Sequence, residues 1–360
     1  MNTLMKKLDK GTITSKLIII ALIFSGTIIN TKSTIINLLL GSAAMVILAI
    51  YIGKYTNIYS EYVGEKRGGL LSATLGNLPE LTMGIWSLKY GMISMVKWAL
   101  IGAIISNMLL VLGVSIFLGG IKYKKQSFNK NIARTNIKML MLALSAMILM
   151  ATVNYYNPLS EDLLVSISVK VAVVLIFVYL LGLIFSLVTH SNLFIVLEEK
   201  EEKKSSNKKN QGINLIIILA LSVALFFVSE NVIRNLNVMV INHGVSENLL
   251  GILIIPLIGN IGENLAAIMG ALKNKVNMSI EIAIGSSIQI ALFVTPLFII
   301  LAHFMGIPIT FLFAPFQIIM ALVAIAMAFM VFMDGKSYWF EGAILLAIYV
   351  ICIISYYYMI

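Results

Sequence analysis

The chain has 360 residues, of which 60% are hydrophobic and 12% are charged, and its mean hydropathy is +0.98. Soluble globular domains average about 45–50% apolar and about 25% charged residues, so this composition excludes a soluble domain. The single cysteine, Cys352, excludes an internal disulfide and a cysteine-ligated metal cluster. The formal net charge of +10 is compatible with nucleic-acid binding or with an asymmetric membrane topology, and the positions of the charges distinguish the two.

Apolar runs that are long enough to cross a hydrocarbon core of about 30 Å recur along the whole chain. The first run follows a lysine, as a signal peptide would, but no small-residue cleavage site closes it and another run begins at once. We therefore predict an all-α membrane protein in which the first run is a retained helix. The eleven predicted spans lie at residues 15–31, 34–54, 68–89, 95–119, 137–154, 163–187, 212–234, 246–271, 279–303, 308–333 and 339–359.

Lysine and arginine fall mainly on one side of these spans. When the loops alternate between sides, 21 of the 26 basic residues lie on one side, and only Lys32, Lys89, Lys97, Lys170 and Arg234 lie on the other. The positive-inside rule then places the N-terminus in the cytosol and the C-terminus outside it. The basic charge thus indicates topology, and we predict no nucleic-acid partner.

A polar stretch at residues 197–210 separates the sixth and seventh spans and carries four glutamates within five residues. We predict a solvated cytosolic linker. A cation-sensing regulatory role is the alternative, although the interleaved lysines would weaken the binding of a divalent ion. The chain then divides into an N-terminal tail with an extra helix, a first five-helix repeat, the linker and a second five-helix repeat, at residues 1–33, 34–190, 191–211 and 212–360.

One short motif occurs in both repeats at a constant offset of 183 residues. Gly-Asn-Leu-Pro-Glu at residues 76–80 returns as Gly-Asn-Ile-Gly-Glu at residues 259–263, and residues 101–106 return as residues 284–289. Both copies place a glutamate, Glu80 or Glu263, inside an apolar span. A carboxylate there is costly and indicates a functional site.

The two motif glutamates lie on the third and eighth spans, which are five spans apart. Because five is odd, the two copies enter the membrane from opposite faces, so the repeats must have inverted topology. Such repeats place a shared site near the midplane and favour alternating access over a permanent pore.

The residues around the two glutamates offer only oxygen ligands. Prolines at positions 79, 256 and 296 cannot donate a helical hydrogen bond, which releases the carbonyl groups of Leu75, Ile252 and Leu292. An all-oxygen site suits a hard cation, calcium in particular, which takes about 6–8 oxygen ligands. For serine and asparagine, the alternative is a role in helix packing. The predicted cation and proton ligands are Glu80, Glu263, Asn77, Asn260, Ser106, Ser286 and Gln289, with Glu80 and Glu263 as the metal-binding pair.

Two buried carboxylates also bind protons. Desolvation and a neighbouring like charge both disfavour two ionised groups, so at least one should hold a proton while the site is empty. A divalent cation and protons therefore compete for the same oxygens, with about two protons replaced by one ion. A third proton would need another group, and Glu230, deep in the seventh span, is the accessory candidate.

These residues resemble the calcium/proton exchanger branch of the calcium/cation antiporter superfamily, from about Glu61 to the C-terminus. The matching signatures are residues 68–81, 106–113, 259–264 and 285–294. The resemblance implies low-affinity, high-capacity calcium extrusion driven by protons, with the two glutamates binding calcium and protons in turn. It implies no permanently bound cofactor, and Ca²⁺ is the transported substrate. The chain departs from the usual pattern at Asn264, where a histidine is common, and at the bulky Leu78 and Ile261.

We therefore predict a Ca²⁺/H⁺ antiporter, a multi-pass protein of a prokaryotic plasma membrane that contacts the lipid bilayer; whether copies form a homo-oligomer is left open. The alternative is an exchanger for sodium and calcium or for another divalent cation such as Mn²⁺. Gln289 stands where sodium-coupled relatives favour an acid, which argues against sodium. An ion channel would lack counter-ion coupling. The chain has no protease, hydrolase or phosphate-binding motif, so we predict a secondary transporter and not an enzyme.

Overall fold

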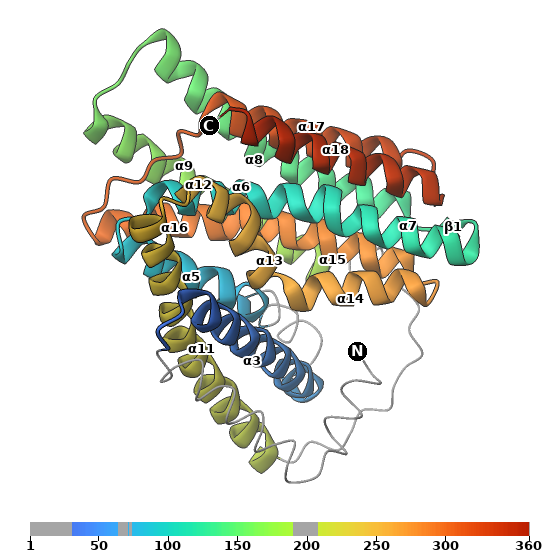
Figure 1. Ribbon diagram of the computed structural model, residues 1–360. Coiled ribbons are helices and arrows are strands. Elements are labelled where there is room, and N and C mark those ends of the chain that lie inside the picture. The colour runs from blue at the N-terminus through green and yellow to red at the C-terminus, as the bar shows by residue number, and fades with distance from the viewer. Residues whose placement is uncertain (1–30, 64–70, 72–73, 190–207, 360) are drawn as a thin grey trace. The chain divides into compact units, whose positions relative to one another are not determined.

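The computed structural model describes residues 31–63, 71, 74–189 and 208–359, and that part of the chain is almost entirely helical (Figure 1). The first predicted span, at residues 15–31, lies almost wholly outside the described residues, as does most of the predicted linker. The helices of the first half are α3 (Thr34–Val63), α5 (Leu78–Lys89), α6 (Ile93–Ile105), the π-helical η1 (Ser106–Val111), α7 (Leu112–Tyr123), α8 (Lys130–Tyr156), α9 (Glu161–Ile184) and the π-helical η2 (Phe185–Thr189).

The second half begins with the longest described helix and contains two further π-helical segments. Its helices are α11 (Lys208–His243), α12 (Glu247–Leu249), η3 (Leu250–Ile254), α13 (Ile255–Gly259), α14 (Ile261–Leu272), α15 (Val276–Gln289), η4 (Ile290–Val294), α16 (Thr295–Phe304), α17 (Pro315–Val331) and α18 (Trp339–Tyr357). Two short strands, β1 (Gln126–Ser127) and β2 (Lys336–Ser337), pair antiparallel, with Gln126 opposite Ser337.

The prediction of an all-helical, multi-span membrane protein is confirmed. Seven described helical runs are long and apolar enough to cross a membrane, and the bent pair Glu247–Gly259 and Ile261–Leu272 makes up to eight. Of the other predicted spans, the one at 308–333 is represented by the 17-residue helix α17, and the one at 68–89 is described mainly by α5, of 12 residues. The total of eleven spans and the inverted arrangement stay predictions.

The chain divides into two compact units, and each takes helices from both predicted repeats. Among the described residues, one unit contains residues 31–63, 71, 74–92, 180–189, 208–250 and 258–262, and the other contains residues 93–179, 251–257 and 263–359. The first motif lies wholly in the first unit, whereas the second motif is divided between the two units. Glu80, Gly259 and Asn260 belong to the first unit, and Glu263 belongs to the second.

In the first unit, α11 packs along α3 and also against α5. Gly41 allows α3 to come close, since a Cβ atom on it would lie 2.8 Å from Cγ2 of Val232. On α5, the indole Nε1 of Trp86 donates a hydrogen bond of 2.8 Å to the carbonyl of Phe226 on α11. Their rings lie 4.9 Å apart between centroids. These contacts fix α5, the helix that carries Glu80, on α11.

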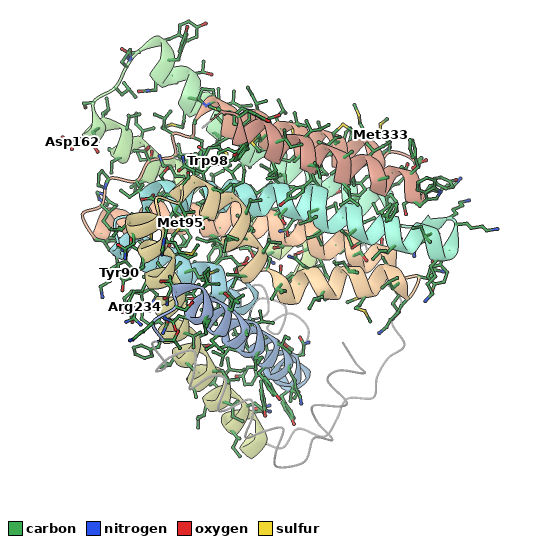
Figure 2. All side chains as sticks on the ribbon, in the orientation of Figure 1. Tyr90, Met95, Trp98, Asp162, Arg234 and Met333 are labelled. Carbon is green, nitrogen blue, oxygen red and sulfur yellow. The ribbon has the colours of Figure 1, made fainter. Side chains whose placement is uncertain are left out.

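In the second unit, two long helical runs, α6–η1–α7 and α15–η4–α16, are mostly buried. The segment η3 packs closely on α6. A Cβ atom on Gly251 would lie 2.5 Å from the carbonyl oxygen of Met95 and 2.9 Å from Cβ of Trp98, two residues labelled in Figure 2. A glycine pair, Gly113 and Gly342, likewise lets α7 and α18 meet at backbone distance.

Candidate cation-binding site

The first motif lies at a break between two helical segments. Residues 74–76 are helical, Asn77 forms a turn, and α5 begins at Leu78. Pro79 lies in the first turn of α5, where a missing N–H costs no helical hydrogen bond. Asn77 takes the N-cap position without capping the helix through its side chain, and Glu80 lies in the first turn. Asn77 is 0% and Glu80 is 7% exposed, so both polar side chains are buried at a helix start.

The second motif has the same local structure. Helix α13 ends at Gly259, Asn260 forms the turn, and α14 begins at Ile261 with Glu263 in its first turn. The helical stretches on either side of this break are bent by 63°. Asn260 is buried, and Glu263 is half-buried as a residue. The equivalence of the two motifs therefore extends from sequence to backbone structure.

Within the first unit, the glutamate of one motif lies against the glycine of the other. A Cβ atom on Gly259 would lie 3.1 Å from Oε1 of Glu80 and 3.2 Å from its Cδ. A side chain at position 259 would therefore displace the carboxyl group of Glu80 by a few tenths of an ångström. The structure thus brings Glu80 and the Gly259–Asn260 turn together, although they are about 180 residues apart in the chain.

Within the second unit, Glu263 lies at the end of a hydrogen-bonded relay. Nδ2 of Asn107 donates to Oγ of Ser286 at 3.0 Å, and the side chain of Ser286 hydrogen-bonds the Glu263 carboxyl group. Because Oγ of Ser286 accepts from Asn107, its own hydroxyl proton is available to Glu263. Among the described residues, Oε2 of Glu263 and Oγ of Ser106 are buried and have no hydrogen-bond partner. Buried polar atoms of this kind call for a further partner, such as an ion.

The π-helical segments repeat with the motifs, which the sequence analysis did not anticipate. Segment η1 begins at Ser106, and η4 begins immediately after Gln289, the residue that corresponds to Ser106 in the second repeat. π-Helical turns are rare and are frequent at functional sites. Gln289 is half-buried and lies three residues after Ser286, on the same face of α15.

One of the carbonyl groups predicted to be released, that of Ile252, lies against a neighbouring helix. Ile252 lies in η3, four residues before Pro256, which cannot donate a helical hydrogen bond to it. The carbonyl oxygen of Ile252, however, would lie 2.6 Å from a Cβ atom on Gly102. It is therefore covered by α6 in this structure.

The remaining predicted residue, Glu230, lies half-buried on α11 in the first unit. No described residue forms a hydrogen bond or an ion pair with it. The predicted ligands include Ser106 but not the adjacent Asn107. Its contact with Ser286 places it beside the motif carboxylate.

The C-terminal end of α14 accepts hydrogen bonds from the last two residues of α7 and from β1. The last carbonyl groups of α14 accept hydrogen bonds from Nζ of Lys122 (2.9 Å) and the hydroxyl of Tyr123 (3.0 Å), both on Leu272, and from Nε2 of Gln126 (2.9 Å) on Ala271. A lysine at a helix C-terminus also complements the helix dipole. These contacts hold the C-terminal end of α14, the helix whose first turn contains Glu263.

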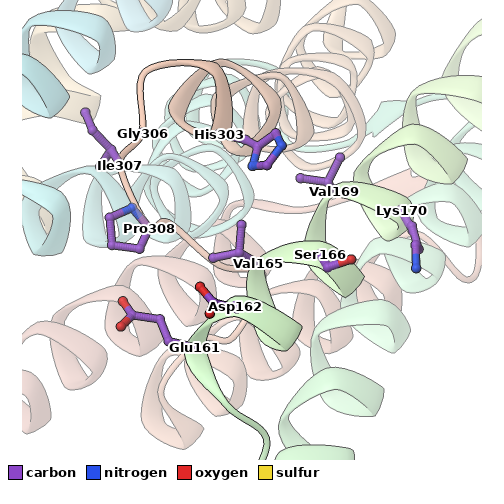
Figure 3. Close-up of a pocket in the computed structure, with 10 residues that line it drawn as sticks. All are labelled: Glu161, Asp162, Val165, Ser166, Val169, Lys170, His303, Gly306, Ile307 and Pro308. Carbon is purple, nitrogen blue, oxygen red and sulfur yellow. The ribbon is translucent and has the colours of Figure 1, made fainter.

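No group of three or more histidine, cysteine, aspartate or glutamate side chains in the described residues could hold a metal ion. A cation would therefore be bound by few carboxylates and several neutral oxygens. A pocket of about 640 Å³ elsewhere in the second unit lies between the start of α9 and the end of α16 (Figure 3). Its acids, Glu161 and Asp162, complement the N-terminus of α9, and none of the motif residues lines it.

Comparisons with known proteins place this arrangement in a family. The family described as sodium/calcium exchanger protein matches residues 33–188 and 213–358. A Ca(2+)/H(+) antiporter of Aphanothece halophytica is 38% identical over 333 residues, which cover 89% of each chain. The Ca(2+)/H(+) antiporter ChaA of Bacillus subtilis is 34% identical over 318 residues, which cover 87% of this chain and 89% of that protein. The chain belongs to the calcium/proton exchanger family.

The fold of this exchanger is also similar to solved structures. The structure of native YfkE has a TM-score of 0.78 and 29% sequence identity, and the match covers 94% of this chain and 98% of that chain. The H+/Ca2+ exchanger CAX has a TM-score of 0.73 at 18% identity, covering 94% of this chain and 87% of that one, and supports the fold alone. The family predicted from the repeated motifs is thereby confirmed.

Proposed function

We propose that this chain is a secondary-active Ca²⁺/H⁺ antiporter that exports Ca²⁺ by alternating access at a site shared by Glu80 and Glu263. The observation that carries the proposal is the contact between Glu80 and Gly259. It joins the carboxylate of one motif to the turn of the other, and the chain reaches Glu263 only four residues after Gly259. The two bacterial relatives are Ca(2+)/H(+) antiporters, which supports the same activity for this chain.

The energetics of the two helix starts favour exchange. A helix N-terminus stabilises a negative charge by about 0.3–1 kcal/mol, whereas removing an ion from water costs several kcal/mol. Neither carboxylate can therefore remain ionised in an apolar span without a compensating cation. Ca²⁺ neutralises two carboxylates, and two protons do the same, so each substrate displaces the other. The exchanger needs no ATP and no permanently bound cofactor.

The neutral oxygens of both motifs would complete the calcium shell. We assign this role to the side chains of Asn77, Asn260, Ser106, Ser286 and Gln289. Ca²⁺ accepts about 6–8 oxygens in flexible geometry, which suits a site with two carboxylates and several amides and hydroxyls. A site with so few charges binds weakly, as export against a high external concentration requires. Glu230 remains the accessory proton site in this proposal.

The proposed architecture has eleven spans, with two inverted five-helix repeats at residues 34–190 and 212–360. Support comes from the two separate stretches that match the family and from the repeated break, glutamate and π-helical segment. The positive-inside rule supports a cytosolic N-terminus and an extracytosolic C-terminus. Bacterial relatives support a location in the cell membrane.

The test replaces each glutamate with glutamine, which retains the volume and removes the charge. In proteoliposomes, Glu80→Gln and Glu263→Gln should abolish proton-driven Ca²⁺ flux, whereas the matched control Glu281→Gln should leave it intact. Glu281 lies at the edge of the ninth predicted span, near the start of α15, and its Oε1 accepts a hydrogen bond of 2.8 Å from Asn277. Wild-type flux in either motif variant would refute the shared site.

A further inference from the structure

A lysine side chain lies inside the second unit without a carboxylate partner. On α6, Nζ of Lys97 donates to the carbonyl oxygen of Leu312 (3.0 Å) and to Oγ1 of Thr310 (3.4 Å), and it lies 6.0 Å from the ring centroid of Phe313. No described aspartate or glutamate forms an ion pair with it. The charge of this half-buried group is held near the start of α6 by two oxygen acceptors and is not neutralised by a described carboxylate.

The position of Lys97 relates it to the motif residues. It lies on the same continuous helical run, Ile93–Tyr123, as Ser106 and Asn107. Asn107 follows ten residues later, which corresponds to about 15 Å along a helix. From Asn107 the relay through Ser286 leads to Glu263. The ammonium group therefore lies in the same unit as one motif carboxylate, on the helical run that carries Asn107.

We propose that Lys97 is a specificity-determining residue whose fixed positive charge lowers the affinity of the cation site for Ca²⁺ and promotes its release. The proposal rests on the proposed function of the site. A positive charge repels a divalent cation twice as strongly as a monovalent one at the same distance. By the positive-inside topology, Lys97 lies toward the extracytosolic end of its span, where an exporter must release Ca²⁺.

The expected magnitude follows from Coulomb's law. For a divalent cation roughly 15 Å from a unit charge, with an effective dielectric constant of about 40–80, removing the charge should tighten Ca²⁺ binding about threefold to sixfold. The segment that Lys97 contacts does not depend on it alone. The backbone N–H of Phe311 donates a hydrogen bond of 2.8 Å to Oγ of the buried Ser168 on α9, which holds the segment independently.

The experiment measures the Ca²⁺ dissociation constant of the purified, full-length protein at fixed pH. Two neutral variants, Lys97→Gln and Lys97→Met, should bind Ca²⁺ about threefold to sixfold more tightly, and Lys97→Arg should bind it like the wild type. The matched control is Lys170→Gln. Lys170 lies on α9 in the same unit, and its side chain is exposed, so solvent screens its charge. This control should not change the affinity.

Three outcomes would overturn the proposal. In the first, the neutral Lys97 variants fold and bind Ca²⁺ no more tightly than the wild type. In the second, Lys97→Arg binds Ca²⁺ like the neutral variants, and in the third, Thr310→Val reproduces the effect of the neutral variants. The last outcome would show that Lys97 acts by holding the segment, since Thr310→Val removes a contact and retains the charge. Glu263→Gln in the same assay tests the proposed cation site separately from the proposed role of Lys97. If Glu263→Gln retains wild-type Ca²⁺ binding, the proposed site fails, whatever Lys97 does.

Discussion

Replacing Gly259 with alanine places a methyl group against the carboxyl group of Glu80. The new Cβ would lie 3.1 Å from both Oε1 of Glu80 and Cε of Met83, closer than ordinary van der Waals contact at 3.4–4 Å. The end of the Met83 side chain can move, but the carboxyl group of Glu80 has to shift by about 0.3 Å or more. Overpacking of this kind costs about 1–3 kcal/mol. Alanine also gains about 1 kcal/mol over glycine in a helix, so the fold should be little affected.

We therefore expect Gly259→Ala to weaken Ca²⁺ binding about tenfold, or about 1.4 kcal/mol, with a small change in thermal stability. The assay is Ca²⁺ binding to purified protein together with proton-driven flux in proteoliposomes. Gly262→Ala is the matched control, because nothing lies within 4 Å of a Cβ atom there. It should bind and transport like the wild type. Wild-type affinity in Gly259→Ala would refute the inference that Glu80 binds the cation from this position.

Three further predictions concern the relay, the protons and the linker. Asn107→Ala removes the donor to Ser286 and should weaken Ca²⁺ binding severalfold in the same binding assay; an unchanged affinity would reduce Asn107 to a packing role. Because protons and Ca²⁺ compete, the apparent Ca²⁺ affinity in flux measurements should weaken as pH falls on the binding side, and a pH-independent affinity would contradict competition. Replacing residues 198–210 with a Gly/Ser linker of equal length should leave the Ca²⁺ dependence of transport unchanged, whereas a shifted activation curve would favour a sensing role.

The repeated motif allowed much of the local site structure to be anticipated. A carboxylate that recurs in register inside two apolar spans has few structural explanations, and Pro79 made a helix break in the first span predictable. The structure places both Asn77 and Asn260 at such breaks. In the second motif Gly262 replaces the proline, so the shared break must come from the remaining motif and its packing, which the sequence does not reveal.

The π-helical segments and the role of Asn107 could not be predicted. A π-helical turn depends on which helix packs beside it, and hydropathy contains no such information. The close approach of Gly102 to Ile252 illustrates this, because the freed carbonyl that the sequence offered as a ligand is covered by a neighbouring helix. Asn107 is similar, since its contact with Ser286 joins residues that are 179 positions apart.

Hydropathy predicts where apolar spans lie along the chain, but it does not predict where a span bends. The run at residues 246–271 reads as one continuous span, yet the chain turns at Asn260 and bends by 63°. The mean hydropathy of a span hardly changes with one turn residue such as Asn260, so it contains no information about a bend.

The driving ion tests the central claim most directly. Purified protein in proteoliposomes, with potassium as the only alkali cation, should move Ca²⁺ when a pH difference is imposed, and an internal pH indicator should report protons moving in the opposite direction. An imposed sodium gradient at matched pH should drive little Ca²⁺ movement, because Gln289 provides an amide where a sodium site would need a further acid. Ca²⁺ flux that follows the sodium gradient in the absence of a pH difference would contradict exchange of Ca²⁺ and protons at Glu80 and Glu263.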